Sequence, residues 1–216
     1  MHMMLNRARI GVVGAGWWST YTHIPGLLEN RNAELVAVCD TNEAVRTRVL
    51  EAFAGLKMYE DLSAMLSDES LDGVVIAVPH KAHHAVAAQC LDRGLHVMLE
   101  KPMTLTARDA EDLLARASEQ GVEVIVGYPW NFTRTAIRAR NVLSSAQLGG
   151  IQHVQCMHSS MVIEFYRGNE SAYQPVFGWT VSGPGDVYAR PELSGGGQGH
   201  LQVTHSSGLM FFVTGL

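Results

Sequence analysis

Residues 9–19 read RIGVVGAGWWS, and this stretch decides the fold. Its first part, residues 9–13, is an apolar run typical of a short buried β-strand, and it leads directly into a glycine turn. Gly14 permits a tight turn, and Gly16 lets the backbone approach a pyrophosphate at the N-terminus of a following helix. The stretch therefore predicts the first βα unit of a dinucleotide-binding domain.

The rest of the N-terminal half repeats this alternation of strand and helix. Apolar, β-rich runs lie at residues 9–13, 34–39, 56–59, 73–78, 96–99 and 123–126. Continuous apolar strands separated by helices are typical of a parallel sheet that is covered on both faces. Thr106 and Asp109 fit a capping box, and Gly121 closes the helix that they begin. We therefore expect an α/β domain, a Rossmann-type doubly wound parallel sheet, in residues 1–127.

The pattern changes in residues 128–216. We expect a helix at 133–145, a turn at 148–150, a long strand at 151–162, loops at 166–198 and a helix at about 199–213. One strand, a loop and a helix are too little for an independent layered domain. These residues are therefore predicted to begin a second domain that is incomplete in this chain; the family resemblance described below implies that it is a C-terminal α/β domain for substrate binding and oligomerisation.

Composition excludes several function classes. The chain has 216 residues, 47% hydrophobic residues and a formal net charge of −5, which gives no reason to expect a nucleic-acid or membrane partner. Its start lacks a signal peptide, so we expect a cytoplasmic protein. Cys39, Cys90 and Cys156 are far apart and odd in number, which favours reduced core thiols over disulfides or a zinc site.

Asp40 follows the second predicted strand and indicates the cofactor. Its carboxylate can accept hydrogen bonds from both hydroxyls of an adenosine ribose and would repel a 2′-phosphate, which favours NAD over NADP. Ser19 replaces the usual third glycine and is still small. Two other interpretations remain: a glycine turn without a ligand, with Asp40 capping a helix, and a methyltransferase that binds a sulfonium nucleotide.

A second motif, Glu100-Lys101-Pro102, follows the strand at residues 96–99. The carboxyl ends of parallel strands share one edge of the sheet, so the Lys101 ammonium is predicted to face the same crevice as the glycine turn. There it could hydrogen-bond a reacting oxygen and stabilise negative charge. Pro102 would fix the backbone after Lys101, in a cis or a trans peptide.

Histidines at positions 80, 83 and 84 share a helix face, but no nearby carboxylate or cysteine completes a metal site. We therefore predict no metal.

Taken in order, these motifs resemble the Gfo/Idh/MocA oxidoreductase family, the group of glucose–fructose oxidoreductase and inositol dehydrogenase. The resemblance rests on the glycine turn, residues 23–25 (HIP), residues 78–83 (VPHKAH), residues 100–102 (EKP), and the glycines at 195–197 followed by His205. It implies an NAD(P)-dependent oxidoreductase that transfers hydride between nicotinamide and a secondary hydroxyl or carbonyl of a sugar, cyclitol or related polyol. It also implies a homo-oligomer if the second domain is complete.

The resemblance also implies site residues. Lys101 would be the catalytic group that binds the reacting oxygen, and His205 the proton acceptor; the alternative for His205 is a packed or solvated helix residue. Trp17 and Trp18 either cover the pyrophosphate or pack in the core. The implied cofactor-binding residues are Gly14, Gly16, Trp17, Trp18, Ser19, Asp40, Thr41, Val78, Pro79, His80, His83, Glu100, Lys101 and Pro102, and the implied substrate-binding residues are Lys101, Trp130, Asn131 and His205.

The sequence departs from the family pattern near the predicted substrate. Leu201 stands where many members have an aspartate one helical turn before the histidine, which leaves Gln198 or Gln202 to orient His205. Trp130 stands where arginine is common, and His80 where asparagine is usual. These changes motivate a second hypothesis, a nucleotide-binding regulatory or catalytically inactive protein of the same fold.

Overall fold

Six parallel strands form one sheet, in the order β3-β2-β1-β4-β5-β6. The computed structural model describes residues 7–145, 148–160, 162–173 and 187–216. The strand order is that of a doubly wound Rossmann sheet, so the predicted fold is confirmed. The strands are β1 (Ala8–Val13), β2 (Ala33–Cys39), β3 (Met58–Tyr59), β4 (Gly73–Ile76), β5 (His96–Glu100) and β6 (Val124–Gly127).

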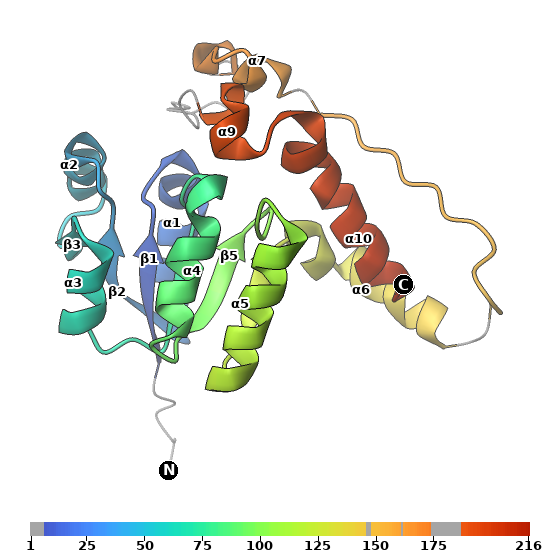
Figure 1. Cartoon of the computed structure of the whole chain (residues 1–216), viewed down its shortest axis with the longest axis horizontal. Coiled ribbons are helices and arrows are strands. Elements are labelled where there is room, and N and C mark those ends of the chain that lie inside the picture. Colours follow the sequence, from blue (N-terminus) through green and yellow to red (C-terminus); the bar gives the residue numbers. More distant parts are fainter. Residues whose placement is uncertain (1–6, 146–147, 161, 174–186) are drawn as a thin grey trace.

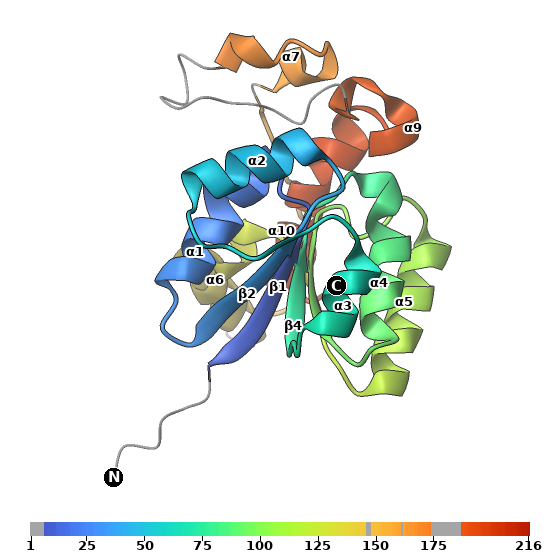
Figure 2. The same ribbon diagram turned by 90° about the vertical axis from the view of Figure 1, so that its left-hand side faces the viewer.

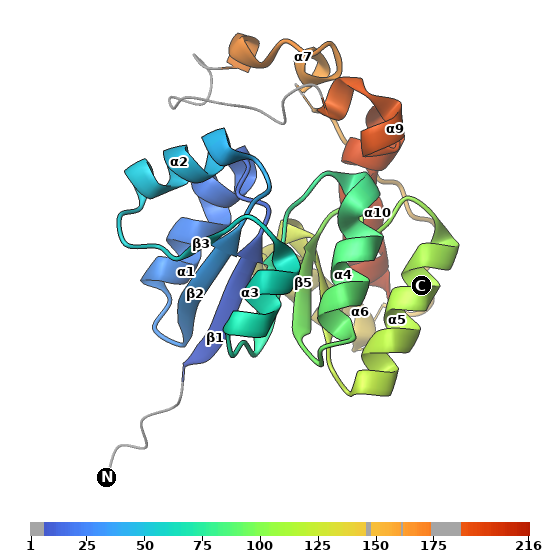
Figure 3. The ribbon, with the colours of Figure 1, turned by 60° about the vertical axis from the view of Figure 1, so that its left-hand side comes forward.

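Helices cover both faces of this sheet, as Figures 2 and 3 show. Successive residues of a strand point to opposite faces, and each face has its own core. Val12 packs in a cluster with Ile24 of α1 and Val49 of α2, whereas Val13 packs in a cluster with Leu113 of α5. The helices of this part are η1 (Ser19–His23), α1 (Ile24–Glu29), α2 (Glu43–Ala52), α3 (Leu62–Asp68), η2 (His80–Ala82), α4 (His83–Leu91) and α5 (Ala107–Gln120).

The start and end of α5 confirm the sequence prediction. The Thr106 hydroxyl accepts a hydrogen bond from the backbone N–H of Asp109, and the helix ends at Gly121. This capping sets the bounds of the helix between β5 and β6, and the loop from Lys101 to Thr106 connects β5 to it.

The C-terminal part consists of short helices and one longer one. Its elements are η3 (Pro129–Phe132), α6 (Arg134–Ser144), α7 (Ile163–Tyr166), η4 (Glu170–Tyr173), η5 (Val187–Ala189), α9 (Pro191–Ser194), η6 (Gly199–Val203) and α10 (Thr204–Thr214). The predicted helices at 133–145 and 199–213 are confirmed by α6 and by η6 with α10, which pack together. Short helices interrupt the predicted loop at 166–198, of which residues 174–186 lie outside the described part.

The predicted strand at residues 151–162 is wrong. Residues 151–160 have no regular secondary structure and run outward as a mostly exposed trace (Figure 1), while residue 161 lies outside the described part. A strand needs a partner for its backbone hydrogen bonds, and the described residues contain no strand after β6. The same segment carries Cys156, which is exposed, so its prediction as a core thiol is also wrong, whereas Cys39 and Cys90 are buried.

Short helices of the C-terminal part lie above the carboxyl ends of the strands (Figure 1). Phe165 of α7 packs against Trp17, and α9 contacts η2, so this part meets the sheet at the edge where the glycine turn lies. Among the described residues, no helix combines the length and the apolar character that crossing a bilayer requires.

Candidate active site

The two glycines of the turn between β1 and η1 have different surroundings. Gly14 has φ +88°, and a Cβ on it would lie 2.5 Å from the carbonyl oxygen of Ala77 on the neighbouring β4 connection. A Cβ on Gly16 would meet no atom within 4 Å. Gly14 is therefore required by the fold itself, whereas Gly16 leaves open space over the turn.

Ser19 stabilises this turn from inside. Its side chain is fully buried, and its hydroxyl donates a hydrogen bond to the carbonyl oxygen of Gly14 at 2.6 Å. The hydroxyl that replaces a third glycine thus connects η1 to the turn.

The two neighbouring tryptophans contact protein groups. Trp17 lies 6.0 Å from the Phe165 ring, between centroids, and the Trp18 indole N–H donates to Glu100 at 2.9 Å. Packing is therefore part of the role of both residues, and their contact with a cofactor stays a prediction.

Asp40 lies directly against the glycine turn. Its Oδ2 accepts a hydrogen bond from the backbone N–H of Ala15 at 2.8 Å, and its Oδ1 accepts one from the N–H of Asn42 at 2.8 Å. The adjacent backbone is held by Arg46, whose guanidinium donates to the carbonyl oxygens of Asp40 and Thr41. Each carboxylate oxygen keeps a further lone pair, which a ribose hydroxyl could use.

Two buried histidines follow β4, and backbone carbonyl groups hold both. His80 donates from Nδ1 to the carbonyl oxygen of Ser194 at 2.9 Å. The His83 ring lies between the carbonyl oxygens of Val78 (3.0 Å) and Pro102 (2.8 Å). Burial lowers the pKa of His80 to about 4 and also lowers the pKa of His83. His80 is therefore neutral near pH 7, and both histidines join the Val78–His83 connection to its neighbours.

Lys101 occupies the carboxyl end of β5, and its side chain is buried. Its Nζ donates to the carbonyl oxygen of Leu201 in η6 at 3.0 Å, and the peptide bond to Pro102 is cis. Burial lowers the pKa of Lys101, and the nearby charge of Glu100 opposes that effect. An amine with a lowered pKa at a strand end is suited to hydrogen bonding and to proton exchange with a reacting oxygen.

His205 lies in α10 with its ring among other rings. Its centroid is 5.1 Å from Trp130, 6.5 Å from Tyr128 and 6.2 Å from His158. Burial, with the charge of Lys101, lowers the pKa of His205 to about 4. Its Nδ1 is buried without a hydrogen-bond partner among the described residues, as is Oδ1 of Asn131. Unpaired buried polar atoms are costly in a folded protein, so these two are candidates for pairing with a ligand.

The residues expected to orient His205 are engaged elsewhere. Leu201 is fully buried, Gln198 accepts a hydrogen bond from Tyr166, and Gln202 accepts one from His158 at 3.3 Å. His158 was not among the site residues predicted from the sequence. Its position in a segment predicted to be a strand carried no signal, because only the fold brings it to within 5.1 Å of the Trp130 ring.

The predicted site residues therefore gather at one edge of the sheet. Asp40 bonds to the glycine turn, and Glu100 at the end of β5 bonds to Trp18 just after that turn. His83 joins the β4 connection to Pro102, which follows β5. The open space at Gly16 and the carboxylate of Asp40, which bonds to the neighbouring Ala15, lie at this edge.

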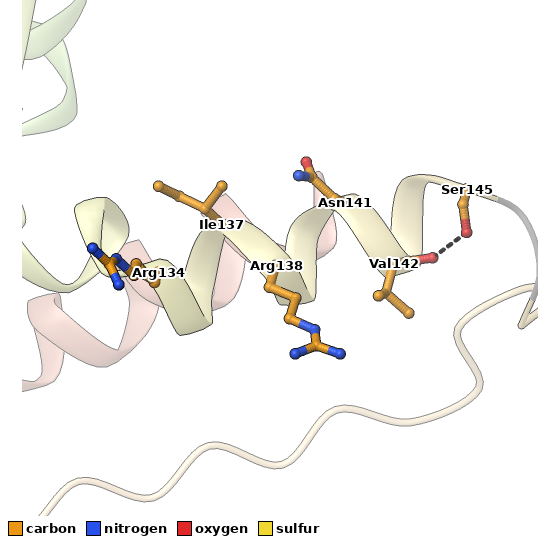
Figure 4. A pocket seen from close by; sticks show the side chains of 6 residues that line it. All are labelled: Arg134, Ile137, Arg138, Asn141, Val142 and Ser145. Carbon is orange, nitrogen blue, oxygen red and sulfur yellow. Dashed lines mark hydrogen bonds between the residues drawn. The ribbon is translucent and has the colours of Figure 1, made fainter.

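A separate hollow lies on the exposed face of α6. It has a volume of about 440 Å³ and contains none of the predicted site residues (Figure 4). Its lining residues are Arg134, Ile137, Arg138, Asn141, Val142 and Ser145. Among the described residues, no group of three or more histidine, cysteine or carboxylate side chains is arranged to hold a metal ion.

Comparison with known proteins identifies the family. The sequence model of the Gfo/Idh/MocA family, described as "Oxidoreductase family, NAD-binding Rossmann fold", matches residues 8–128. Inositol 2-dehydrogenase 1 of Saccharopolyspora erythraea is 30% identical over 154 residues, which are 69% of this chain and 45% of that protein.

Two solved structures extend the comparison. The WlbA dehydrogenase from Bordetella pertussis, in complex with NADH and UDP-GlcNAcA, has a TM-score of 0.62 and 29% identity over 67% of this chain and 41% of that one. GenD2 from gentamicin A biosynthesis, in complex with NAD, has a TM-score of 0.74 and 24% identity over 98% of this chain and 55% of that one, and it supports the fold alone.

The chain spans 38% to 47% of the length of the first curated relatives that it matches. Within that span the family model covers the whole six-stranded sheet, from β1 to β6. The chain belongs to the Gfo/Idh/MocA oxidoreductase family and carries its NAD-binding Rossmann domain.

Proposed function

We propose that this chain is the nucleotide-binding part of an NAD-dependent dehydrogenase that acts on a secondary hydroxyl of a sugar or cyclitol. The observation that carries the proposal is the buried Lys101 amine at the sheet edge that also holds the open glycine turn. The relatives support the substrate class, because one is an inositol dehydrogenase and another was solved with a nucleotide sugar.

In this proposal, Gly14, Gly16 and Ser19 form the turn on which the pyrophosphate rests, and Asp40 accepts the hydroxyls of the adenosine ribose. NAD, when bound, supplies the acceptor of the hydride. Lys101 donates a hydrogen bond to the substrate oxygen and stabilises its negative charge as the proton leaves. His205, which is neutral near pH 7, takes that proton.

The direct test is to follow NADH absorbance while the chain is offered NAD and a panel of polyols, with myo-inositol and glucose as the first probes. Turnover supports the dehydrogenase. NAD binding without turnover on any probe favours the second candidate, a nucleotide-binding protein without catalysis. The specific observation behind that candidate is the buried Leu201, which replaces a carboxylate close to His205.

Asp40→Asn should change cofactor preference. Asparagine keeps an oxygen for the N–H of Ala15 but removes the charge that repels a 2′-phosphate. We expect the ratio of the Kd for NADP to the Kd for NAD to fall about tenfold or more, an effect of about 1.4 kcal/mol. Isothermal titration with both nucleotides measures the ratio. An unchanged ratio in a folded variant would refute the ribose assignment.

The rate of alcohol oxidation should depend on pH with two limbs. His205, with a pKa of about 4, is an available base above that pH, so kcat/KM should fall about tenfold per pH unit below it. At high pH the rate should fall as Lys101 loses its proton, and this fall should begin below the usual lysine range because the pKa of Lys101 is lowered.

His205→Asn should remove the fall in rate at low pH. Recovery of activity on return to pH 7 controls for acid unfolding, and an acid limb that survives in His205→Asn contradicts the assignment.

A further inference from the structure

The Glu100 carboxylate receives hydrogen bonds from three groups. Its Oε1 accepts from the Trp18 indole N–H at 2.9 Å and lies 2.9 Å from Nε2 of His23. Its Oε2 accepts from the backbone N–H of Lys101 at 3.2 Å. The side chains of His23 and Glu100 are only 11% and 14% exposed, so water contributes little to this interaction. The contacts therefore form a buried polar junction.

The junction connects two elements that are far apart in the sequence. Trp18 directly precedes η1 and His23 is its last residue, and η1 follows the glycine turn, while Glu100 is the last residue of β5. On the neighbouring strand, a Cβ on Gly127 would lie 3.2 Å from Glu100 Oε1, so that glycine leaves room for the carboxylate. The carboxylate thus joins the predicted nucleotide-binding turn to the strand end that carries Lys101.

The balance of charges makes Glu100 an anion in this buried place. Burial by itself raises the pKa of Glu100, but the hydrogen bonds of His23 and Trp18 and the charge of Lys101 outweigh it, and the net pKa is lowered. The anion in turn opposes the effect of burial on the pKa of Lys101. A buried carboxylate stays charged only while it is paired. Loss of a donor to Glu100 should therefore also lower the pKa of Lys101, because the charge that opposes burial is weakened.

We propose that His23 is a positioning residue that, through Glu100, keeps Lys101 cationic and fixes it relative to the nucleotide-binding turn. This inference depends on the proposed function in one respect only, namely the role of Lys101 toward a substrate. His23 contacts the Glu100 carboxylate and acts on Lys101 through it.

Other titratable groups surround the same two residues and remain in every variant below. They come from η2, α4, η5 and α10. The charge of Lys101 acts on His80 and His205, and the charge of Glu100 acts on His80, His83, Tyr188 and His205. A change seen only when His23 is replaced is therefore assigned to His23.

The test measures the titration of Lys101 without requiring turnover. The folded protein is acetylated with a trace of acetic anhydride between about pH 7 and about pH 11, and peptide mass spectrometry gives the extent at each lysine. Lys81 is exposed and serves as the internal reference. We expect His23→Ala to shift the Lys101 midpoint to lower pH and to leave Lys81 unchanged. His23→Gln should restore the midpoint, because an amide N–H can still donate to Glu100.

Two further variants make the result specific. His84→Ala, which removes a partly exposed histidine paired with Asp112, is the matched control and should leave the Lys101 midpoint unchanged. In a Glu100→Gln background, His23→Ala should cause no further shift, because the charge through which His23 acts is absent. A Lys101 midpoint that is unchanged in His23→Ala overturns the proposal. So does a glutamine variant that behaves like the alanine variant, or an equal shift at Lys81.

Activity separates this inference from the proposed function. With NAD and myo-inositol, His23→Ala should lower kcat about 10–100-fold and change the Kd for NAD less than about threefold, since a charge-assisted hydrogen bond is lost away from the nucleotide. A wild-type chain that binds NAD but turns over no polyol would overturn the proposed function. The acetylation result would then still decide the role of His23.

Discussion

Lys101→Met is expected to lower turnover about 10³-fold or more, to below detection, while the Kd for NAD changes less than about threefold. Methionine matches the buried aliphatic part of the lysine but supplies no donor to a substrate oxygen and no positive charge. The backbone and the glycine turn, which hold the nucleotide in our proposal, are unchanged by the substitution. NADH absorbance measures turnover, and isothermal titration measures the affinity for NAD.

Lys101→Arg is the matched variant for this prediction. It keeps the positive charge but presents a planar guanidinium, which fits the buried place beside Leu201 poorly. Turnover should therefore stay at least about 10²-fold below that of the wild type. Loss of NAD binding in parallel with turnover in Lys101→Met would remove Lys101 from its catalytic role and assign it to the cofactor site.

Gly16→Val is expected to raise the Kd for NAD about 100-fold or more without unfolding the protein. A Cβ at this position meets no protein atom within 4 Å, so the fold tolerates a side chain there. The added methyl groups fill the space through which a pyrophosphate would approach the helix N-terminus. Circular dichroism on heating checks the fold, and titration with NAD gives the affinity.

Gly14→Ala is the contrasting variant in the same turn. Its backbone is left-handed, with φ +88°, and its Cβ would lie 2.5 Å from a backbone oxygen. We expect a loss of about 2–4 kcal/mol in the free energy of unfolding, seen as a lower Tm even without nucleotide. If Gly16→Val binds NAD like the wild type, the turn does not hold the pyrophosphate. If Gly14→Ala is as stable as the wild type, the turn geometry described above is incorrect.

The sequence predicted the Rossmann half of the chain well because its signals are local. Each strand is a short apolar run whose alternate residues enter opposite cores, as Val12 and Val13 do, and each helix carries its own caps, as Thr106 does for α5. A strand that is followed by a glycine turn and a helix admits few arrangements, because crossover connections between parallel strands are right-handed. Such patterns specify both the elements and their order in the sheet.

The C-terminal part shows where local signals fail. Residues 151–162 alternate in a way that predicts a strand, yet residues 151–160 have no regular secondary structure. Alternating apolar and polar residues predict which side chains would face inward, but they do not indicate whether a partner strand is available. The helices α6 and α10 were predicted because a helix makes its backbone hydrogen bonds within itself.

By itself, the sequence determined the fold, the glycine turn, the acid after β2 and the lysine after β5, because each depends on residue type and on position relative to a strand end. Only the tertiary structure decided which side chains meet at that edge. It places His158 beside Trp130 and His205, and it brings His23 to Glu100. It also lets the Lys101 amine donate a hydrogen bond to the carbonyl oxygen of Leu201. Such meetings join residues 28 to 100 positions apart along the chain, and long-range packing, not local pattern, sets which of them come within a few ångströms.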